Sequence, residues 1–122
     1  MIHANAYSWR EFGIEAEFVI ASYLRLKGWN IMFSPSSRGP ADMVASKDGN
    51  IWCIQVKAST KSPHIKSEEI TKLKAYASSI KGLPVFASFQ PWNDKDGERH
   101  GISVGDYTIF FYSLNNWRSL RI

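Results

Sequence analysis

The feature that most constrains the fold of this chain is an Asp-Gly dipeptide, Asp48-Gly49, placed between two apolar runs. An Asp-Gly pair in this setting is typical of the two-residue turn of a β-hairpin, because both turn positions require a positive φ. Pairing residue 47 with residue 50 across the turn sets the register and places Asp42 opposite Gln55. The sequence therefore predicts an antiparallel hairpin that carries an acid and an amide side by side on one face.

Helices and further strands are predicted around this hairpin. Residues 8–27 carry apolar side chains at three- and four-residue steps, and Ser8 followed by Glu11 has the spacing of an N-terminal capping box. A second helix is expected to be capped by Ser67 and ended by Gly82. This order of elements predicts a single α/β domain over residues 1–122. The strands are expected at 29–33, 42–46, 51–59, 83–89 and 106–112, with a polar loop at 90–101 and a short helix at 113–118.

Composition and charge narrow the class of protein. Apolar residues make up 44% and charged residues 21% of the 122 positions, a mixture typical of one globular domain. Fifteen Lys and Arg residues against eleven Asp and Glu residues give a net charge of +4, which favours an anionic partner. No apolar stretch approaches the ~20 residues that cross a bilayer. We therefore expect no membrane-spanning segment. Because the single Cys53 cannot form an internal disulfide, we expect a buried thiol and a reducing cytoplasm.

The predicted hairpin gathers chemically active side chains on one face. Period-two alternation puts Lys57 on the face of Gln55, while Ile54 and Val56 point the other way into the core. Carboxylate and amide oxygens suit Mg²⁺, which takes one or two carboxylates from the protein and keeps several waters. Such an ion activates water and stabilises charge on a phosphate under attack. The chemistry predicted for Asp42, Gln55 and Lys57 together is hydrolysis of a phosphodiester.

The first predicted helix offers a further acid to this site. Glu15 and Glu17 lie about equally far from the centre of its apolar stripe, on opposite flanks. Gly13 lies one turn before Glu17 on the same flank, and it leaves that side open to a close approach by backbone, metal or substrate. The pattern therefore favours Glu17, with Glu15 as the alternative.

These residues, in this order, resemble a known family. The motif G-x-x-x-E from Gly13 to Glu17, then Asp42 after a Ser-Arg-Gly-Pro loop, then Gln55-Val56-Lys57 resembles the PD-(D/E)XK nuclease superfamily. Within it the chain is most similar to the archaeal Holliday junction resolvases. The segments SEEITKLKAYA and GLPVFASF extend the resemblance, so that it covers roughly residues 8–90. The resemblance implies a restriction-endonuclease-like core, in which a central mixed β-sheet is flanked by helices.

The resemblance also implies a role for each matched residue. Asp42 would bind the metal, Glu17 would support it directly or through water, and Lys57 would be catalytic. Gln55 would offer its side-chain carbonyl and Val56 its backbone carbonyl to Mg²⁺, for which Mn²⁺ would substitute. A serine of the preceding loop, Ser36 or Ser37, would contribute to DNA binding or catalysis. Four basic residues flank the site in sequence and are candidates for phosphate contacts: Arg10, Arg38, Lys61 and Lys66.

The chain departs from the family pattern at three positions. Ala41 stands where a proline usually precedes the aspartate, and Ser59 stands where a basic residue often follows the lysine. Gln55 replaces the usual glutamate of the second strand and removes one negative charge from the metal site. The resemblance implies a Mg²⁺-dependent endodeoxyribonuclease on branched DNA, with Holliday junctions in recombination and repair as the first expectation. The alternatives are a restriction-like or repair nuclease on duplex DNA, and an inactive DNA-binding module with the nuclease fold.

A homodimer is expected as well, because one chain supplies one site whereas symmetric cleavage of two strands requires two. The expected contact surface is apolar and comes from the C-terminal strand and tail, around Phe110, Tyr112 and Trp117. The small size of the domain leaves little room for elements that read bases. This favours recognition of DNA by its shape.

Overall fold

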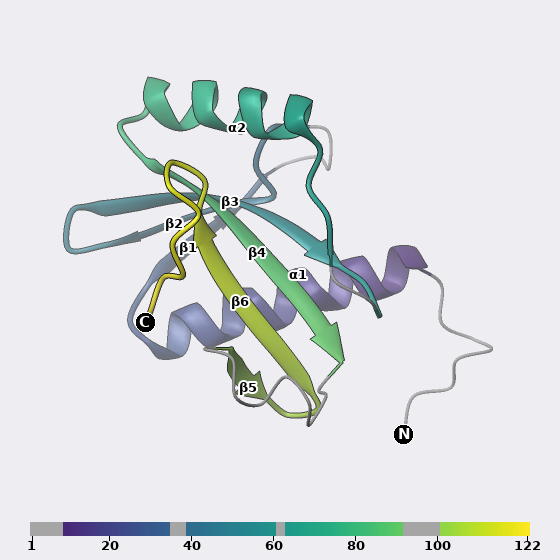
Figure 1. The fold of residues 1–122 in the computed structure, drawn as a ribbon. Helices are drawn as coiled ribbons and strands as arrows, with labels where there is room; N and C mark the ends of the chain where they lie inside the picture. Colours follow the sequence, from purple (N-terminus) through teal and green to yellow (C-terminus); the bar gives the residue numbers. More distant parts are fainter. Residues whose placement is uncertain (1–8, 35–38, 61–62, 92–100) are drawn as a thin grey trace.

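Six strands form one mixed sheet, and a helix packs on each of its faces (Figure 1). The computed structural model describes residues 9–34, 39–60, 63–91 and 101–122. The sheet order is β1-β2-β3-β4-β6-β5, in which β3 and β4 are parallel and the other neighbours antiparallel. This architecture confirms the predicted α/β fold with a restriction-endonuclease-like core. The elements are α1 (Trp9–Leu26), β1 (Asn30–Phe33), β2 (Met43–Lys47), β3 (Asn50–Ala58), α2 (Ser67–Ser79), β4 (Leu83–Pro91), β5 (Ile102–Val104) and β6 (Tyr107–Ser113).

The β2–β3 hairpin has the predicted turn and register. Asp48 and Gly49 have φ values of 50° and 83°, so both turn residues are left-handed, as a type I′ turn requires. Lys47 pairs with Asn50 next to the turn, and the ladder continues regularly to Met43 opposite Ile54. The local chemistry of two residues thus fixes the position of the whole hairpin.

Helix α1 covers one face of the sheet with the apolar stripe that its spacing predicts. Ile20 and Leu24 are fully buried against strand residues that include Ile54. The helix ends where Gly28 adopts a φ of 94°, which lets Trp29 donate its N–H to the Leu24 carbonyl at 3.0 Å. The predicted capping serine, Ser8, lies outside the described residues.

Helix α2 packs on the opposite face, where Leu73 and Ala77 are buried against Cys53. Its predicted cap was wrong by one position. Lys66 occupies the N-cap and Ser67 is the first helical residue, because the Glu69 carboxylate accepts the Lys66 N–H. Gly82 does not end the helix either, since Lys81 adopts the left-handed φ of 57°.

Gly82 is required for a different reason, which also concerns the cysteine. A Cβ at Gly82 would lie 3.0 Å from the Cys53 sulfur, so the glycine lets the chain entering β4 pass close to β3. Cys53 is fully buried, as expected for a structural thiol, and burial raises its pKa to about 11. A thiol with this pKa stays protonated and unreactive at neutral pH.

The C-terminal third differs most from the prediction. Strand β5, with three residues, falls between the predicted loop and the last predicted strand, and it pairs with β6 through a turn at Gly105. Residues 113–118 form no helix; the chain turns there and comes back along β6, with a bridge between Tyr112 and Ser119. In the described parts of the chain, neither helix is long and apolar enough to span a membrane.

Candidate active site

Asp42 lies where the regular ladder between β2 and β3 ends. Its backbone N–H donates to the Ile54 carbonyl at 2.8 Å, although Ile54 is already the register partner of Met43. Two residues of one strand thus face one residue of the other, which is the arrangement of a β-bulge. The prediction that Asp42 stands directly opposite Gln55 was therefore wrong. The Asp42 carboxylate turns instead to the backbone of β3, where its Oδ2 accepts the Val56 N–H at 2.7 Å.

Ser34, at the end of β1, holds the other side of the Asp42 backbone. Its N–H donates to the Asp42 carbonyl at 3.0 Å, and its hydroxyl donates to the carbonyl of Ala41. These bonds close the base of the loop between β1 and β2 and fix the chain where the aspartate begins. The resemblance implies a functional serine deeper in this loop, at Ser36 or Ser37. Both lie outside the described residues, as does Arg38.

The Val56 backbone faces the same gap as the Asp42 carboxylate. In an extended strand the N–H and C=O of one residue point toward the same neighbouring strand. Because the Val56 N–H reaches Asp42, its carbonyl also points to the side of β2, beyond the last regular pair. The Val56 side chain is buried in the core under α1. The Val56 carbonyl thus lies on the side of β3 where the resemblance implies a metal ligand.

Glu17 brings a second carboxylate to Asp42 from α1. Burial and the negative charge of Asp42 together raise the pKa of Glu17 to about 7. Glu15, the alternative, lies on the other flank of the helix and accepts a hydrogen bond from the Tyr107 hydroxyl at 2.6 Å. The structure therefore brings Glu17, and not Glu15, to the aspartate. A Cβ placed on Gly13 would have no atom within 4 Å, so the helix surface one turn before Glu17 is open.

Asp42 itself is in an environment that disfavours its charge. Burial is the main cause of a raised pKa, and the nearby charge of Glu69 acts in the same direction. The Val56 N–H and the positive charge of Lys57 lower the pKa, but they do not compensate fully. Two carboxylates with raised pKa values side by side form a site whose charge a bound cation would relieve.

Lys57 is held by a residue that sequence analysis missed. Its Nζ lies 2.7 Å from Oε2 of Glu69, which stands in the first turn of α2. Partial burial acts to raise the pKa of Glu69, but the hydrogen bonds and the charges of Lys57 and Lys66 together lower it below its ordinary value. A sequence pattern could have indicated Glu69, because it stands three residues after the N-cap, which is the usual place of a capping-box glutamate. Assigning the cap to Ser67 concealed it.

The donor atoms at this site fit a hard divalent cation with few charged ligands. Within the described ranges, no three His, Cys, Asp or Glu side chains are arranged to hold a metal ion. A site here would combine the carboxylates of Asp42 and Glu17 with neutral oxygens and water, as Mg²⁺ accepts. Gln55 is half-buried on the same face of β3 as Lys57. Its amide and the Val56 carbonyl are the neutral oxygens available.

Two of the predicted DNA-binding residues are described, and both flank the site. Arg10 is exposed on α1 and stands two turns before Glu17, on the same flank of the helix. Lys66 is exposed at the start of α2, where its charge lowers the pKa of Glu69. Lys61 lies outside the described residues. The site is therefore bordered by positive charge from both helices.

Comparisons with known proteins agree with the fold. The family model described as archaeal Holliday junction resolvase (Hjc) matches residues 8–94. The solved structure of Archaeoglobus fulgidus Hjc, a Holliday junction resolvase from an archaeal hyperthermophile, matches with a TM-score of 0.64 and 17% identity, over 84% of this chain and 78% of that one. The bacterial homing endonuclease I-Ssp6803I matches with a TM-score of 0.58 and 12% identity, over 93% and 72%. No curated protein matches significantly. At these identities the two structures show a shared fold.

Proposed function

The chain belongs to the archaeal Holliday junction resolvase family, and from this premise we propose that it is a metal-dependent endodeoxyribonuclease that cuts branched DNA, with four-way junctions as its substrate. The observation that carries the proposal is that the Asp42 carboxylate, which accepts the Val56 N–H, lies close enough to Glu17 and Lys57 for their charges to interact. Two acids and an amine in one place are the groups that phosphodiester hydrolysis needs.

The residues that would hold Mg²⁺ come from three elements. Asp42 would bind it through a carboxylate oxygen, and Glu17 would bind it directly or through water. Gln55 and Val56 would add their side-chain and backbone carbonyls, and Mn²⁺ would substitute for Mg²⁺. An ion bound there would lower the pKa of a coordinated water and would stabilise negative charge on the phosphate.

The protein's own groups supply the rest of the chemistry. The Lys57 amine carries positive charge to the phosphate under attack, or orients the attacking water through its N–H donors. Glu17, whose pKa burial and the charge of Asp42 raise to about 7, would bind a cation as the deprotonated carboxylate. Arg10 and Lys66 would place the DNA backbone across the two helices by contacts to phosphates. Ser36, Ser37, Arg38 and Lys61 remain predictions for this role.

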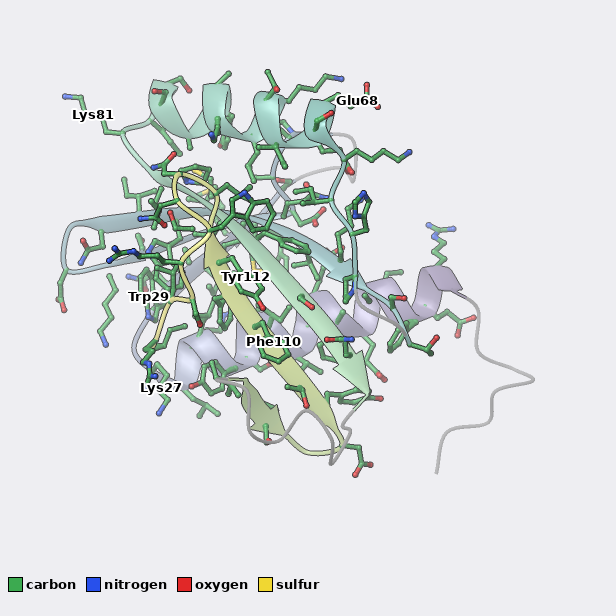
Figure 2. All side chains as sticks on the ribbon, viewed as in Figure 1. Lys27, Trp29, Glu68, Lys81, Phe110 and Tyr112 are labelled. Carbon is green, nitrogen blue, oxygen red and sulfur yellow. The ribbon has the colours of Figure 1, made fainter. Side chains whose placement is uncertain are left out.

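We propose a homodimer, because a four-way junction has two strands to cut. The predicted contact surface needs correction. Phe110 is only 8% exposed, and Tyr112 stacks on Phe110 along β6 (Figure 2), so only Trp117 of the predicted three is largely exposed. Sedimentation equilibrium of the parent and of Trp117→Ser tests both statements. A monomeric parent contradicts the dimer, whereas a dimeric variant contradicts the surface.

Cleavage assays on four-way junctions, flaps, single strands and duplexes test the proposed function directly. With Mg²⁺ or Mn²⁺, we expect the four-way junction to be cut in preference to the duplex, and Lys57→Ala to abolish cutting. Lys72→Ala, which removes the same charge from an exposed position on α2, is the matched control. An intact junction with either ion, or equal cutting by Lys57→Ala, would contradict the proposal. Cutting of duplex alone would favour a restriction-like or repair nuclease.

Gln55 favours one second candidate, a DNA-binding module that has lost metal affinity. This candidate predicts salt-dependent binding of DNA that neither Mg²⁺ nor Asp42→Asn alters. Calorimetric titration with Mg²⁺ separates the two functions. For the nuclease we expect measurable binding, and about tenfold tighter binding in Gln55→Glu, because a carboxylate is the stronger ligand for a hard cation. Absence of ion binding in the parent would favour the module.

A further inference from the structure

The ion pair between Lys57 and Glu69 joins the proposed catalytic amine to helix α2. Of the residues predicted for the site, only Lys66, the N-cap, belongs to this helix. Lys57 Nζ lies 2.7 Å from Glu69 Oε2, and the other oxygen, Oε1, accepts the Lys66 N–H at 3.1 Å. Each carboxylate oxygen thus has its own donor. The helix start fixes the orientation of the carboxylate, and the carboxylate in turn fixes the amine.

The core under α2 fixes the distance between the two partners. Leu73, one turn after Glu69, is fully buried, and so is Ala77, a further turn along the helix. Both pack in one cluster with Cys53, which lies on the same face of β3 as Lys57. The helix cannot slide along the strand without opening this core. Tertiary packing between α2 and β3 therefore holds the two partners of the ion pair close together.

The charges around the site give this pair a role. Gln55, two residues before Lys57 on the same face, is neutral, so β3 itself provides no negative partner for the amine. Asp42 is close enough to Lys57 for the two charges to interact, but its Oδ2 accepts the Val56 N–H. Glu69 supplies, from α2, the carboxylate that accepts a hydrogen bond from the amine. The Lys57 and Glu69 side chains are 31% and 27% exposed, and such partly exposed pairs contribute little to stability. The main effect of the pair is to restrict the amine.

Resting on the proposed nuclease function, we propose that Glu69 is a positioning residue, which holds the Lys57 amine beside Asp42 in the orientation that cleavage requires. A lysine without this partner has four rotatable bonds and samples many positions around the phosphate. Small displacements of a reacting group reduce rates strongly, even when binding is unchanged. Glu69 thus acts on the rate of cutting, through Lys57, and not on the affinity for DNA.

Glu69→Gln, compared with Glu68→Gln, tests this role. Glu68 is exposed in the same first turn of α2 (Figure 2), so both variants lose one negative charge at the same helix end. The amide introduced by Glu69→Gln still offers a carbonyl to the Lys66 N–H, which preserves the helix start. We expect single-turnover cleavage by Glu69→Gln to be about 10- to 100-fold slower than by Glu68→Gln. The junction Kd without metal and the Tm of the two variants should agree.

Chemical modification of lysine amines tests the Lys57–Glu69 ion pair without a cleavage assay. Reductive methylation followed by mass spectrometry measures how fast each lysine amine reacts. We expect Lys57 to react several-fold faster in Glu69→Gln than in the parent, and Lys72 to react equally in both proteins. If Glu69→Gln shows no cooperative unfolding, Glu69→Asp takes its place, because it keeps the charge but withdraws the carboxylate by one methylene. It too should cut more slowly than Glu68→Gln.

The outcomes separate this inference from the proposed function. A parent that cuts the junction, together with a Glu69→Gln variant that cuts as fast as Glu68→Gln, overturns the role of Glu69 and leaves the function intact. Unchanged methylation of Lys57 overturns the positioning contact itself. A parent that cuts no DNA with either ion overturns the proposed function and this inference with it. Slower cutting with equal Kd and equal Tm supports the inference.

Discussion

The two ends of the β2–β3 hairpin follow different rules. At the turn end, Asp48 and Gly49 adopt the left-handed conformations that the turn requires, and Lys47 pairs regularly with Asn50. At the open end the ladder breaks at Asp42, and carboxylates arrive from both helices. The turn end stabilises the fold with local chemistry, while the open end gathers like charges at a cost to stability. Substitutions at the two ends should therefore separate stability from activity.

The largest expected effect belongs to the open end. Asp42→Asn should slow single-turnover cleavage of a four-way junction by about 100- to 1000-fold, because the variant lacks the charge that would hold the cation. Stability should change little, since the Asn side-chain carbonyl still accepts the Val56 N–H and the repulsion of Glu17 disappears. Quenched-flow or gel assays measure the rate, and urea unfolding measures the stability.

Asp48→Asn is the matched control at the turn end, because it removes the same charge from the same hairpin. Asn-Gly forms this turn as well as Asp-Gly, so stability should be kept. Cleavage by Asp48→Asn should equal that of the parent. If Asp42→Asn cuts as fast as Asp48→Asn, the distinction between the two ends is wrong.

The second-largest effect is expected at the turn end, on stability and not on activity. Gly49 has a φ of 83°, and Gly49→Ala should lower the free energy of unfolding by about 1–2 kcal/mol, because a Cβ is disfavoured in this region. No atom beyond the adjacent residues lies within 4 Å of that Cβ, so the cost comes from the local backbone conformation and not from packing. The cleavage rate per folded molecule should be unchanged. Gly49→Asn, which tolerates a positive φ better, should recover part of the loss in urea unfolding. A slower cleavage rate in both variants would show that the turn communicates with the site.

The same contrast explains what the sequence could predict. The turn end was predicted correctly, register included, because two adjacent residues determine it. The resemblance to a known family supplied the order of Glu17, Asp42, Gln55 and Lys57, but not their geometry. The bulge at Asp42 depends on bonds from β1 and β3, which residues far apart in the sequence provide. No local pattern contains that information.

Short elements and helix ends were the other source of error. Strand β5 has three residues and exists because it pairs with β6, so its own pattern is too short to recognise. Helix ends predicted from sequence can shift by a residue. The predicted cap of α2 was one residue late, and the capping role of Glu69 was therefore missed. The partner of Lys57 was missed because α2 was predicted only as a packing element.

The third prediction concerns pH at the open end. The pKa of Glu17 is about 7 in the folded protein against an ordinary value of 4.5, so the protonated carboxyl is favoured by folding. Its contribution to stability is fully present below pH 4.5 and is lost as the pH rises through 7. Because Glu17 is only partly buried, we discount the full shift and expect a loss of about 1 kcal/mol.

Urea unfolding in EDTA between pH 4.5 and 8 measures this loss. Glu17→Gln should remove most of it, whereas Glu15→Gln, on the opposite flank of α1, should retain it. Saturating Mg²⁺ should also reduce the dependence, because a cation stabilises the two carboxylates in their charged form. A pH dependence that survives in Glu17→Gln would assign the effect to Asp42, whose pKa burial also raises.

The smallest effect tests why a glycine stands in α1 near the open end. Gly13→Ala should raise the free energy of unfolding by about 0.5–1 kcal/mol, because alanine is the better helix former and its Cβ meets no atom within 4 Å. Packing therefore gives no reason for the glycine. If the DNA backbone approaches the helix there, the more stable variant should bind the junction a few-fold more weakly. Ser22→Ala, at an exposed position of α1 away from the Glu17 flank, should gain stability without this loss. Equal junction affinity in both variants would show that the open surface at Gly13 is not a DNA contact.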